Sequence, residues 1–385
     1  MKDNELKCSI YKSCSGCQMQ NLCYNDQIKY KQKELSVLLS RFVKVSPIIE
    51  MDNPYHYRNK VQMAFKKVSA KKIFSGIYQS KKNTVTPVKE CLLDDKRADA
   101  IIATITKLVL SFKLEPYDYI KQKGFIRHVL VRTGFTSGQI MVVLVTTSPV
   151  FPSKNKFLNA LLERHPEIST VVLSVNNFSN GFVLGDKEEV VFGKGYITDT
   201  LCGLEFRISP RSFYQVNPVM TEKLYNKAIE LADLKQGNKV LDAYCGIGTI
   251  SLIASKSGAD VIGVELNKDA YSDALTNAKL NKINNAYFYN DDAGDFIKKL
   301  TKDGQKIDVV ILDPPRAGST STFINSVSDL APEKVVYVSC NPVTLKRDLD
   351  CFRYKGYKVK SIQPFDMFPF THHVETVCLL NKVKK

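Results

Sequence analysis

Two residues near the C-terminal end of the chain are suited to covalent chemistry on a ring. Cys340 follows an apolar segment, residues 334–338, and is itself followed by Asn-Pro, and Glu375 lies further downstream. If the apolar segment is a strand, Cys340 stands at its carboxyl end, where open α/β sheets bind their ligands. A thiolate nucleophile with a carboxylate base is the pair that methyl transfer to a pyrimidine ring requires.

The chemistry would begin at carbon 6 of uracil, because carbon 5 is a poor nucleophile by itself. Addition of the Cys340 thiolate to carbon 6 would convert the ring to an enolate, which can attack an electrophilic methyl group through carbon 5. The proton on carbon 5 must then be removed, and Glu375 would be the general base. In the alternative interpretation, Cys340 is a buried structural thiol and Glu375 a solvated carboxylate on an edge strand.

The elements that must position these residues are those of an α/β sheet. Strands are expected at residues 239–243, 261–265, 286–289, 307–312, 334–339, 357–364 and 376–381. Helical segments, for example residues 249–256 and 269–281, fall between the first five strands, which predicts a doubly wound sheet. The last two strands lack a long helix between them, so we expect an antiparallel end.

A cofactor site is expected where the first of these strands runs into a glycine-containing loop. The loop, Tyr-Cys-Gly-Ile-Gly, precedes a helix that begins at Thr249, and glycines there let the backbone approach a ligand. Glu265 ends the second strand, where it can accept hydrogen bonds from a ribose, and Asp292 follows the third, near an adenine edge. Asp313 follows the fourth strand. This ordered set favours S-adenosylmethionine over a dinucleotide, for which Gly or Ala is expected near Ser251.

Composition favours a polyanionic partner. The 385 residues suffice for two or three domains, and a hydrophobic content of 44% supports a sizeable core. Lys and Arg number 55 against 39 Asp and Glu, a net charge of +16, which favours binding to nucleic acid. The apolar runs are too short to span a membrane, and the polar N-terminus has no signal segment, so we expect a cytoplasmic protein.

The N-terminal half of the chain has a different pattern. Residues 26–42 show helical periodicity, and residues 45–205 mix strands, expected at 125–132 and 140–145, with helices, expected at 98–112 and 154–164. Basic and aromatic residues in this region suit RNA contact, namely Tyr55, Tyr57, Arg58, Lys60, Arg127, His128 and Arg132. Period-two alternation predicts that His128 and Arg132 share one face of a strand and Arg127 the other. A solvated basic edge strand is the alternative.

Five of the ten cysteines lie in the first quarter of the chain. They are Cys8, Cys14, Cys17, Cys23 and Cys91. Such clustering in a cytoplasmic chain argues against disulfides and for a metal or cluster site. On spacing alone, four thiolates suit tetrahedral zinc and an iron–sulfur cluster equally well.

Together these motifs resemble the bacterial RNA 5-methyluridine methyltransferases over nearly the whole chain. The motifs are Cys-x5-Cys-x2-Cys at 8–17, Ser-Phe-Tyr-Gln-Val-Asn at 212–217, Asp-Ala-Tyr-Cys-Gly-Ile-Gly at 242–248, Asp-Pro-Pro-Arg at 313–316, Val-Ser-Cys-Asn-Pro at 338–342 and Glu-Thr at 375–376. The resemblance implies that Cys340 is the nucleophile and Glu375 the base. It implies cofactor contacts for Gln215, Tyr244, Thr249, Glu265, Asp292 and Asp313.

The same resemblance implies a 4Fe–4S cluster bound by Cys8, Cys14, Cys17 and Cys91, with Cys23 as an extra thiol that could replace one ligand. The cluster would be structural or would position RNA, since methyl transfer needs no electron. The resemblance is to the form without an N-terminal TRAM domain, and its cysteine motif favours 23S rRNA over tRNA as the substrate. A non-catalytic RNA-binding protein and a small-molecule methyltransferase are further alternatives, and we expect a monomer.

We therefore expect an α/β protein in three parts. Residues 1–45 would form a cysteine-rich iron–sulfur segment and a helix. Residues 46–205 would form a mixed α+β, RNA-binding middle domain that supplies Cys91. Residues 206–385 would form a doubly wound, seven-stranded, Rossmann-like methyltransferase domain that binds S-adenosylmethionine.

Overall fold

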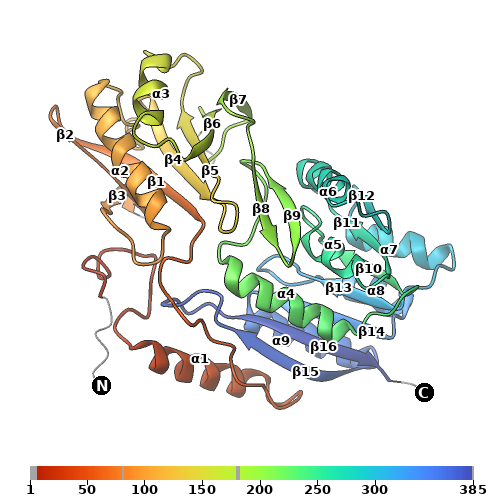
Figure 1. Cartoon of the computed structure of the whole chain (residues 1–385). Coiled ribbons are helices and arrows are strands. Elements are labelled where there is room, and N and C mark those ends of the chain that lie inside the picture. The colour runs from red at the N-terminus through yellow and green to blue at the C-terminus, as the bar shows by residue number, and fades with distance from the viewer. Residues whose placement is uncertain (1–6, 80–81, 179–182, 384–385) are drawn as a thin grey trace. The chain divides into compact units, whose positions relative to one another are not determined.

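The computed structural model describes residues 7–79, 82–178 and 183–383, which form two compact units (Figure 1). The N-terminal unit contains the described residues up to Gln20 together with Pro54–Thr200 and Arg207–Arg211. The C-terminal unit contains Asn21–Asn53, Leu201–Phe206 and the described residues from Ser212 onward. The segment Asn21–Asn53 thus packs with the C-terminal part of the chain, whereas the division expected from the sequence splits it between the parts 1–45 and 46–205.

A mixed sheet of seven strands organises the N-terminal unit, in the order β3-β2-β1-β4-β5-β6-β7. Its strands are β1 (Lys60–Ser69), β2 (Lys72–Gln79), β3 (Thr84–Pro87), β4 (Ile126–Thr133), β5 (Ile140–Thr146), β6 (Ile168–Val175) and β7 (Lys187–Phe192). Strands β5 and β6 are parallel, and the other neighbouring pairs are antiparallel. The strands predicted at 125–132 and 140–145 are confirmed as β4 and β5.

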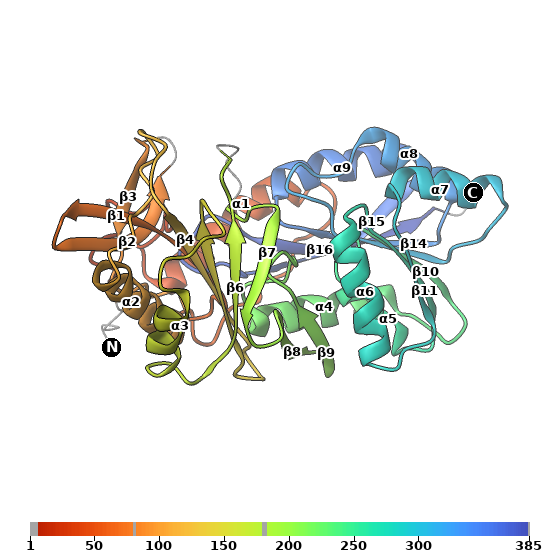
Figure 2. The ribbon, with the colours of Figure 1, turned by 90° about the horizontal axis from the view of Figure 1, so that it is seen from above.

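Helices α2 (Lys96–Ser111) and α3 (Lys154–Leu162) pack on one face of this sheet (Figure 2). Both match helices that the periodicity predicts. Helix α2 begins after Asp95, whose side chain accepts a hydrogen bond from the Arg97 backbone N–H and so caps the first turn. Its apolar residues recur on one side and join the core formed with β4 and β5.

The C-terminal unit is built on the predicted doubly wound sheet, in the order β12-β11-β10-β13-β14-β16-β15. Its strands are β10 (Lys239–Ala243), β11 (Asp260–Val264), β12 (Ala286–Tyr289), β13 (Val309–Leu312), β14 (Lys334–Ser339), β15 (Tyr357–Phe365) and β16 (Glu375–Lys382). The first five in sequence pair with one another in parallel, whereas β16 is antiparallel to both β14 and β15. The predicted antiparallel end is thereby confirmed.

Seven helices belong to the described part of this unit. They are α1 (Tyr24–Leu39), α4 (Pro218–Ala232), α5 (Thr249–Ser255), α6 (Lys268–Leu280), α7 (Ala293–Lys302), α8 (Ser321–Leu330) and α9 (Pro342–Tyr354). Helices α4 and α9 both begin with proline at the first turn after an asparagine cap, which explains the Asn-Pro pairs at residues 217–218 and 341–342.

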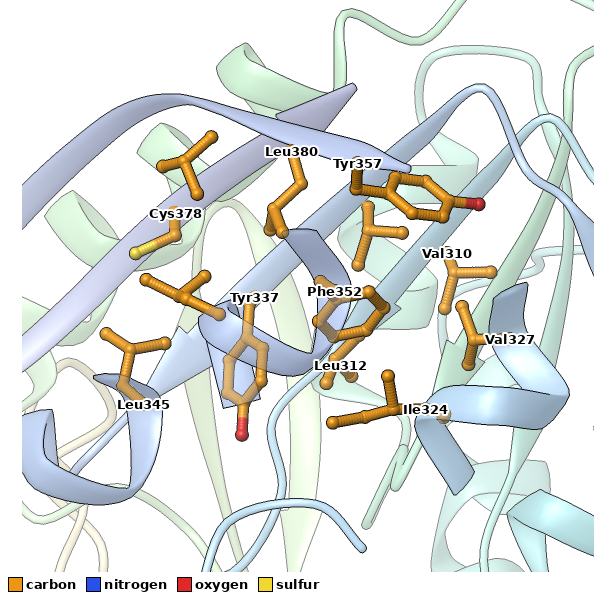
Figure 3. Close-up of a cluster of buried hydrophobic side chains, with 14 of the residues drawn as sticks. Val310, Leu312, Ile324, Val327, Tyr337, Leu345, Phe352, Tyr357, Cys378 and Leu380 are labelled. Atoms are coloured by element: carbon orange, nitrogen blue, oxygen red, sulfur yellow. The ribbon is translucent and has the colours of Figure 1, made fainter. Parts of the chain in front are cut away.

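A large buried cluster joins α8 and α9 to the sheet (Figure 3). Phe352 of α9 meets Tyr357 of β15 edge to face, with ring centroids 5.7 Å apart. Tyr337 of β14 is fully buried in the same cluster, and α1 contributes Leu35 and Leu39 to it. The strand that ends next to Cys340 is therefore held by packing on a continuous core.

A two-stranded ribbon, β8 (Ile197–Leu201) and β9 (Leu204–Ile208), completes the described elements. Among the described residues, every helix is too short or too polar to cross a lipid bilayer.

Candidate active site

The register of the C-terminal sheet brings Cys340 and Glu375 together. Ser339 of β14 pairs with Thr376 of β16, so the next antiparallel step places Cys340 opposite Glu375. Cys340 is half-buried and Glu375 is buried. The charge of Glu375 contributes to raising the pKa of Cys340, as expected for close neighbours.

Burial dominates the acid–base properties of this pair. Burial raises the pKa of Cys340 to about 11, with further increases from Glu375 and Asp313 and an opposing effect of Arg316. Burial also raises the pKa of Glu375 well above its usual range, and the charge of Asp313 adds to this effect. A carboxylate with a raised pKa is a stronger base once it has lost its proton. The arrangement therefore provides a nucleophile and a proton acceptor on adjacent strands.

Three loops are tied together around Cys340. The Asn341 side chain donates a hydrogen bond to the Arg316 carbonyl at 3.1 Å, and its Oδ1 accepts one from the Val343 N–H at 3.1 Å, capping α9. Arg316 also lies 3.3 Å from Nδ1 of His373, two residues before Glu375. The Asp-Pro-Pro-Arg loop thus connects the segments that carry the two candidate catalytic residues.

Asp313 joins this group from the carboxyl end of β13. It is half-buried, and the loss of solvent around its carboxyl group raises its pKa to about 7. Its charge affects the pKa of both Cys340 and Glu375. The structure therefore brings Asp313 together with both candidate catalytic residues.

The loop after β10 has the backbone conformation of a ligand site. Tyr244 has a φ of 71°, which is unusual for a residue other than glycine, and Gly246 and Gly248 also have positive φ. A Cβ at Gly248 would lie 3.0 Å from the ring of Phe288, so the position has little room for a side chain. Glu265 fixes the loop, because its Oε2 accepts a hydrogen bond from the Gly246 N–H at 3.0 Å.

Asp242, at the end of β10, was not assigned a role from the sequence although it begins the glycine motif. It is buried, and Ser251 Oγ donates a hydrogen bond to its Oδ2 at 2.5 Å. Its Oδ1 is also buried and has no hydrogen-bond partner among the described residues. Burial raises the pKa of Asp242 to about 7. This acceptor at the edge of the glycine loop fits a cofactor that carries hydrogen-bond donors.

Tyr225 of α4 is a further site residue that sequence reasoning missed. Its buried hydroxyl group hydrogen bonds with the side chains of Thr249 and Gln215. Burial raises the pKa of Tyr225, and the charges of Asp313 and Glu375 raise it further. Tyr225 thus connects two predicted cofactor residues to the catalytic group. Only burial and contacts reveal it, because a tyrosine on an amphipathic helix carries no motif.

Tyr244 begins the glycine loop, and Asp292 lies near enough for its charge to act on the Tyr244 hydroxyl. Burial raises the pKa of Tyr244 to about 12, and the charge of Asp292 contributes to this increase. Asp292 is exposed and caps α7 by accepting a hydrogen bond from the Asp295 N–H at 3.0 Å. The Tyr244 ring lies 5.2 Å from that of Phe323. All six predicted cofactor residues therefore lie in the C-terminal unit, at or near the carboxyl edge of its sheet.

Comparison with known proteins decides what this site belongs to. The model of the family described as tRNA (uracil-5-)-methyltransferase matches residues 23–383. The chain belongs to this family.

Individual RNA methyltransferases are similar to this protein over nearly the whole chain. An uncharacterized RNA methyltransferase of Clostridium tetani is 41% identical over 380 residues, which are 98% of this chain and 82% of that protein. One from Halalkalibacterium halodurans is 39% identical over 381 residues, covering 98% and 83%. The crystal structure of Pyrococcus abyssi tRNA (uracil-54, C5)-methyltransferase in complex with S-adenosyl-L-homocysteine matches with a TM-score of 0.81 and 28% identity, covering 95% of this chain and 86% of that one. The protein is an RNA methyltransferase.

The four expected cluster cysteines of this methyltransferase all lie in the N-terminal unit. Cys8, Cys14, Cys17 and Cys91 are half-buried free thiols, whereas Cys23 belongs to the C-terminal unit. Burial raises the pKa of Cys17 to about 11, with smaller contributions from the charges of Cys14 and Cys8. The charge of Cys17 in turn contributes to the raised pKa of Cys91. Across the described residues, no three His, Cys, Asp or Glu side chains are grouped as a metal ion would require.

The basic strand of the N-terminal unit is not a solvated edge. Strand β4 lies in the centre of its sheet, and Arg127, His128 and Arg132 are buried. Arg127 Nη1 donates hydrogen bonds to the carbonyls of Asn176 at 2.9 Å and Phe178 at 2.7 Å. All three side chains are therefore shielded from solvent, and the solvated alternative is wrong.

The predicted alternation of side chains is also wrong at the start of β4. A β-bulge between Ile126 and His128 shifts the register, so Arg127 and His128 both contact Tyr119. His128 Nε2 lies 2.8 Å from the Tyr119 hydroxyl, and burial lowers the pKa of His128 to about 3. A neutral His128 adds no positive charge to an RNA surface at physiological pH.

The other residues proposed for RNA contact differ in exposure. Tyr57 is buried, and Arg58 Nε lies 3.7 Å from the Asp94 carboxylate. Burial lowers the pKa of Lys60 to about 8, and the charges of Arg132 and Arg58 lower it further. Like charges thus gather on β1 and β4, where Lys60 pairs with Arg132 in register.

Proposed function

We propose that this enzyme transfers a methyl group from S-adenosylmethionine to carbon 5 of a uridine in 23S rRNA through a covalent bond between Cys340 and carbon 6. The observation that carries the proposal is the pairing of Cys340 with Glu375 on adjacent strands, beside Asp313. The charges of both Glu375 and Asp313 act on the Cys340 thiol, which supports a shared site.

The residues of the cofactor loop would hold S-adenosylmethionine, which supplies an electrophilic methyl group on a sulfonium. Glu265 and the unpartnered Oδ1 of Asp242 offer acceptors to its hydroxyl or amino groups. The further contacts are proposed for Gln215, Tyr244, Thr249, Asp292 and Asp313. The strained φ of Tyr244 supports a binding role for this loop, because such strain persists where the surroundings require it.

The proposed steps balance at the uracil ring. The Cys340 sulfur would form a bond to carbon 6, and the electron pair of the C5=C6 bond would attack the methyl carbon through carbon 5. The bond between the methyl group and the sulfonium sulfur would break, and its electron pair would stay on sulfur in neutral S-adenosylhomocysteine. Glu375 then removes the proton from carbon 5, the C5=C6 bond re-forms, and the carbon–sulfur bond breaks to release the thiolate. The flanking loops keep the two residues on one side of the ring, and the uridine must leave its stack to reach them.

Two variants test the covalent mechanism. We expect Cys340→Ala to abolish methylation while leaving S-adenosylmethionine binding intact, and Glu375→Gln to accumulate a covalent protein–RNA adduct visible on a denaturing gel. Cys351→Ala is the matched control, because Cys351 is a half-buried thiol of α9 outside the site. Full methylation by Cys340→Ala would end the covalent mechanism.

The choice of RNA rests on the cysteine motif, which favours 23S rRNA. The tRNA alternative is supported by the family description and by the Pyrococcus abyssi protein, which acts on uracil 54 of tRNA. Mapping 5-methyluridine in both RNAs from a strain without this protein distinguishes the two. Loss of a 5-methyluridine from 23S rRNA alone is the expected result, and loss from tRNA alone would replace the rRNA assignment. We further propose that the enzyme acts as a cytoplasmic monomer.

We also propose that Cys8, Cys14, Cys17 and Cys91 bind a 4Fe–4S cluster. Support comes from four free thiols in one compact unit whose charges influence one another. The methyl transfer itself uses none of them. Protein purified without oxygen should be brown and contain iron, and Cys23→Ser should retain that iron whereas Cys17→Ser loses it. A colourless, zinc-containing preparation would refute the cluster.

A further inference from the structure

The segment that leads into Glu375 is held by a buried polar network rather than by a regular element. Residues 366–374 connect β15 to β16, and Asp366, Met367 and Phe370 are almost completely inaccessible to solvent. A buried irregular segment must find partners for its backbone N–H and C=O groups outside itself. Helix α1, from the other end of the chain, supplies two of these partners through Lys31 and Gln27.

Lys31 of α1 makes the central contact. Its Nζ lies 2.6 Å from Asp366 Oδ1, and both side chains are buried, with exposures of 1% and 0%. The same Nζ donates a hydrogen bond to the Phe368 carbonyl at 3.2 Å. One ammonium group therefore fixes both a side chain and a backbone carbonyl of the connection.

Further contacts surround this ion pair. Gln27, one turn before Lys31 on α1, is fully buried and accepts a hydrogen bond from the Phe370 N–H at 2.9 Å. Asn217 donates one to the Met367 carbonyl at 2.9 Å. The connection is thus held at successive residues, and it ends at Glu375 on β16.

The nature of the Lys31 contact indicates its role. A buried ion pair is seldom the most stable solution for a core, since apolar residues of similar volume often do as well or better. What an ion pair with additional hydrogen bonds does provide is one defined geometry for the groups that it joins. The pair lies where such definition matters, because a small displacement of a catalytic group greatly reduces a rate.

We propose that Lys31 and Asp366 are positioning residues that fix the connection so that the Glu375 carboxylate faces carbon 5 of the uridine. This inference rests on the proposed base role of Glu375. It predicts a specific defect in the second half of the reaction, removal of the proton from carbon 5, and no defect in cofactor binding or in attack by Cys340.

The test uses the full-length enzyme with the double substitution Lys31→Met and Asp366→Asn, which leaves no unpaired buried charge. A matched control is Arg41→Met, which removes the exposed ion pair of Arg41 with Asp350 just beyond α1 and does not touch the connection. Thermal unfolding and S-adenosylmethionine binding are measured for both, together with the rate of adduct formation and the rate of product release on an RNA substrate.

We expect the double variant to bind S-adenosylmethionine with unchanged affinity and to form the Cys340–RNA adduct at the normal rate. Product release should slow at least tenfold, so that the adduct accumulates and kcat falls with little change in KM, while Arg41→Met behaves as the native enzyme. Normal product release in the double variant would overturn the inference, as would equal losses in cofactor binding and adduct formation. Normal product release in Glu375→Gln would instead show that Glu375 is not the base. The Glu375 variant alone therefore tests the base role, and the double variant tests the positioning role.

Discussion

The pKa of Cys340 predicts slow reaction of this thiol with alkylating agents in the free enzyme. Burial raises its pKa from an ordinary 9.0 to about 11. At pH 8, roughly one Cys340 thiol in a thousand is then ionised, compared with about one in ten for an ordinary thiol. Because the thiolate is the reactive form, we expect alkylation roughly a hundredfold slower than in the unfolded chain.

The assay follows iodoacetamide labelling of the peptide that contains Cys340 by mass spectrometry. The same peptide in denaturant provides the reference rate, which removes differences of local sequence. Between pH 7 and 10 the rate in the folded enzyme should rise about tenfold per pH unit without levelling off. A plateau below pH 9, or a rate equal to that of the unfolded chain at pH 8, would refute the reasoning.

A substitution separates the two main causes of the raised pKa. Burial is the larger cause, and the charge of Glu375 is the second. Glu375→Gln removes the charge but leaves Cys340 buried, so alkylation should accelerate yet remain slower than in denaturant. Full recovery of the reference rate in that variant would show that charge, rather than burial, controls the thiol.

Three further substitutions test the cofactor side of the site. Burial raises the pKa of Asp242 from 3.8 to about 7, so its contribution to stability is fully present below pH 4 and is lost as the pH rises through 7. Asp242→Asn should therefore raise the Tm at pH 8 more than at pH 5 in calorimetry. The pKa shift limits the gain in the free energy of unfolding to about 4 kcal/mol. Gly248→Ala should lower stability by about 1–2 kcal/mol, because φ is 83° and Phe288 is close, and should weaken S-adenosylmethionine binding. Tyr225→Phe should preserve the fold but weaken cofactor binding about tenfold in titration calorimetry, since Thr249 loses a hydrogen-bond partner.

The sheet of the C-terminal unit could be predicted because its strands are short apolar runs that end at distinctive motifs. Buried parallel strands read as continuous apolar segments, and the last two strands lack a helix between them. The meeting of Cys340 with Glu375 follows from the same reasoning, since both stand at strand ends on one edge. Local sequence was sufficient there because strand order and side-chain position are linked.

Other features depend on contacts that no local pattern records. The bulge after Ile126 changes which residues of β4 share partners, whereas a count of alternate residues assumes a regular strand. Lys31 resembles any exposed lysine on an amphipathic helix, and lysine is seldom buried without a partner. Its partner, Asp366, is 335 residues away in sequence. Position in the folded chain, rather than residue type, therefore identifies such residues.

A thiol that is mostly protonated in the free enzyme fits a covalent mechanism if the cofactor changes its charge state. The charge of Asp313 adds to the raised pKa of Asp242, Glu375 and Cys340, and that of Glu375 adds to the raised pKa of Cys340, so the site resists any further negative charge before a cation arrives. The sulfonium of S-adenosylmethionine would relieve this repulsion, whereas S-adenosylhomocysteine carries no charge on its sulfur. Binding of S-adenosylmethionine at pH 8 should therefore release more protons than binding of S-adenosylhomocysteine, measured by calorimetry in buffers of different ionisation enthalpy. Equal proton release for the two ligands would contradict this coupling, and Cys340 would then have to ionise only when the uridine binds.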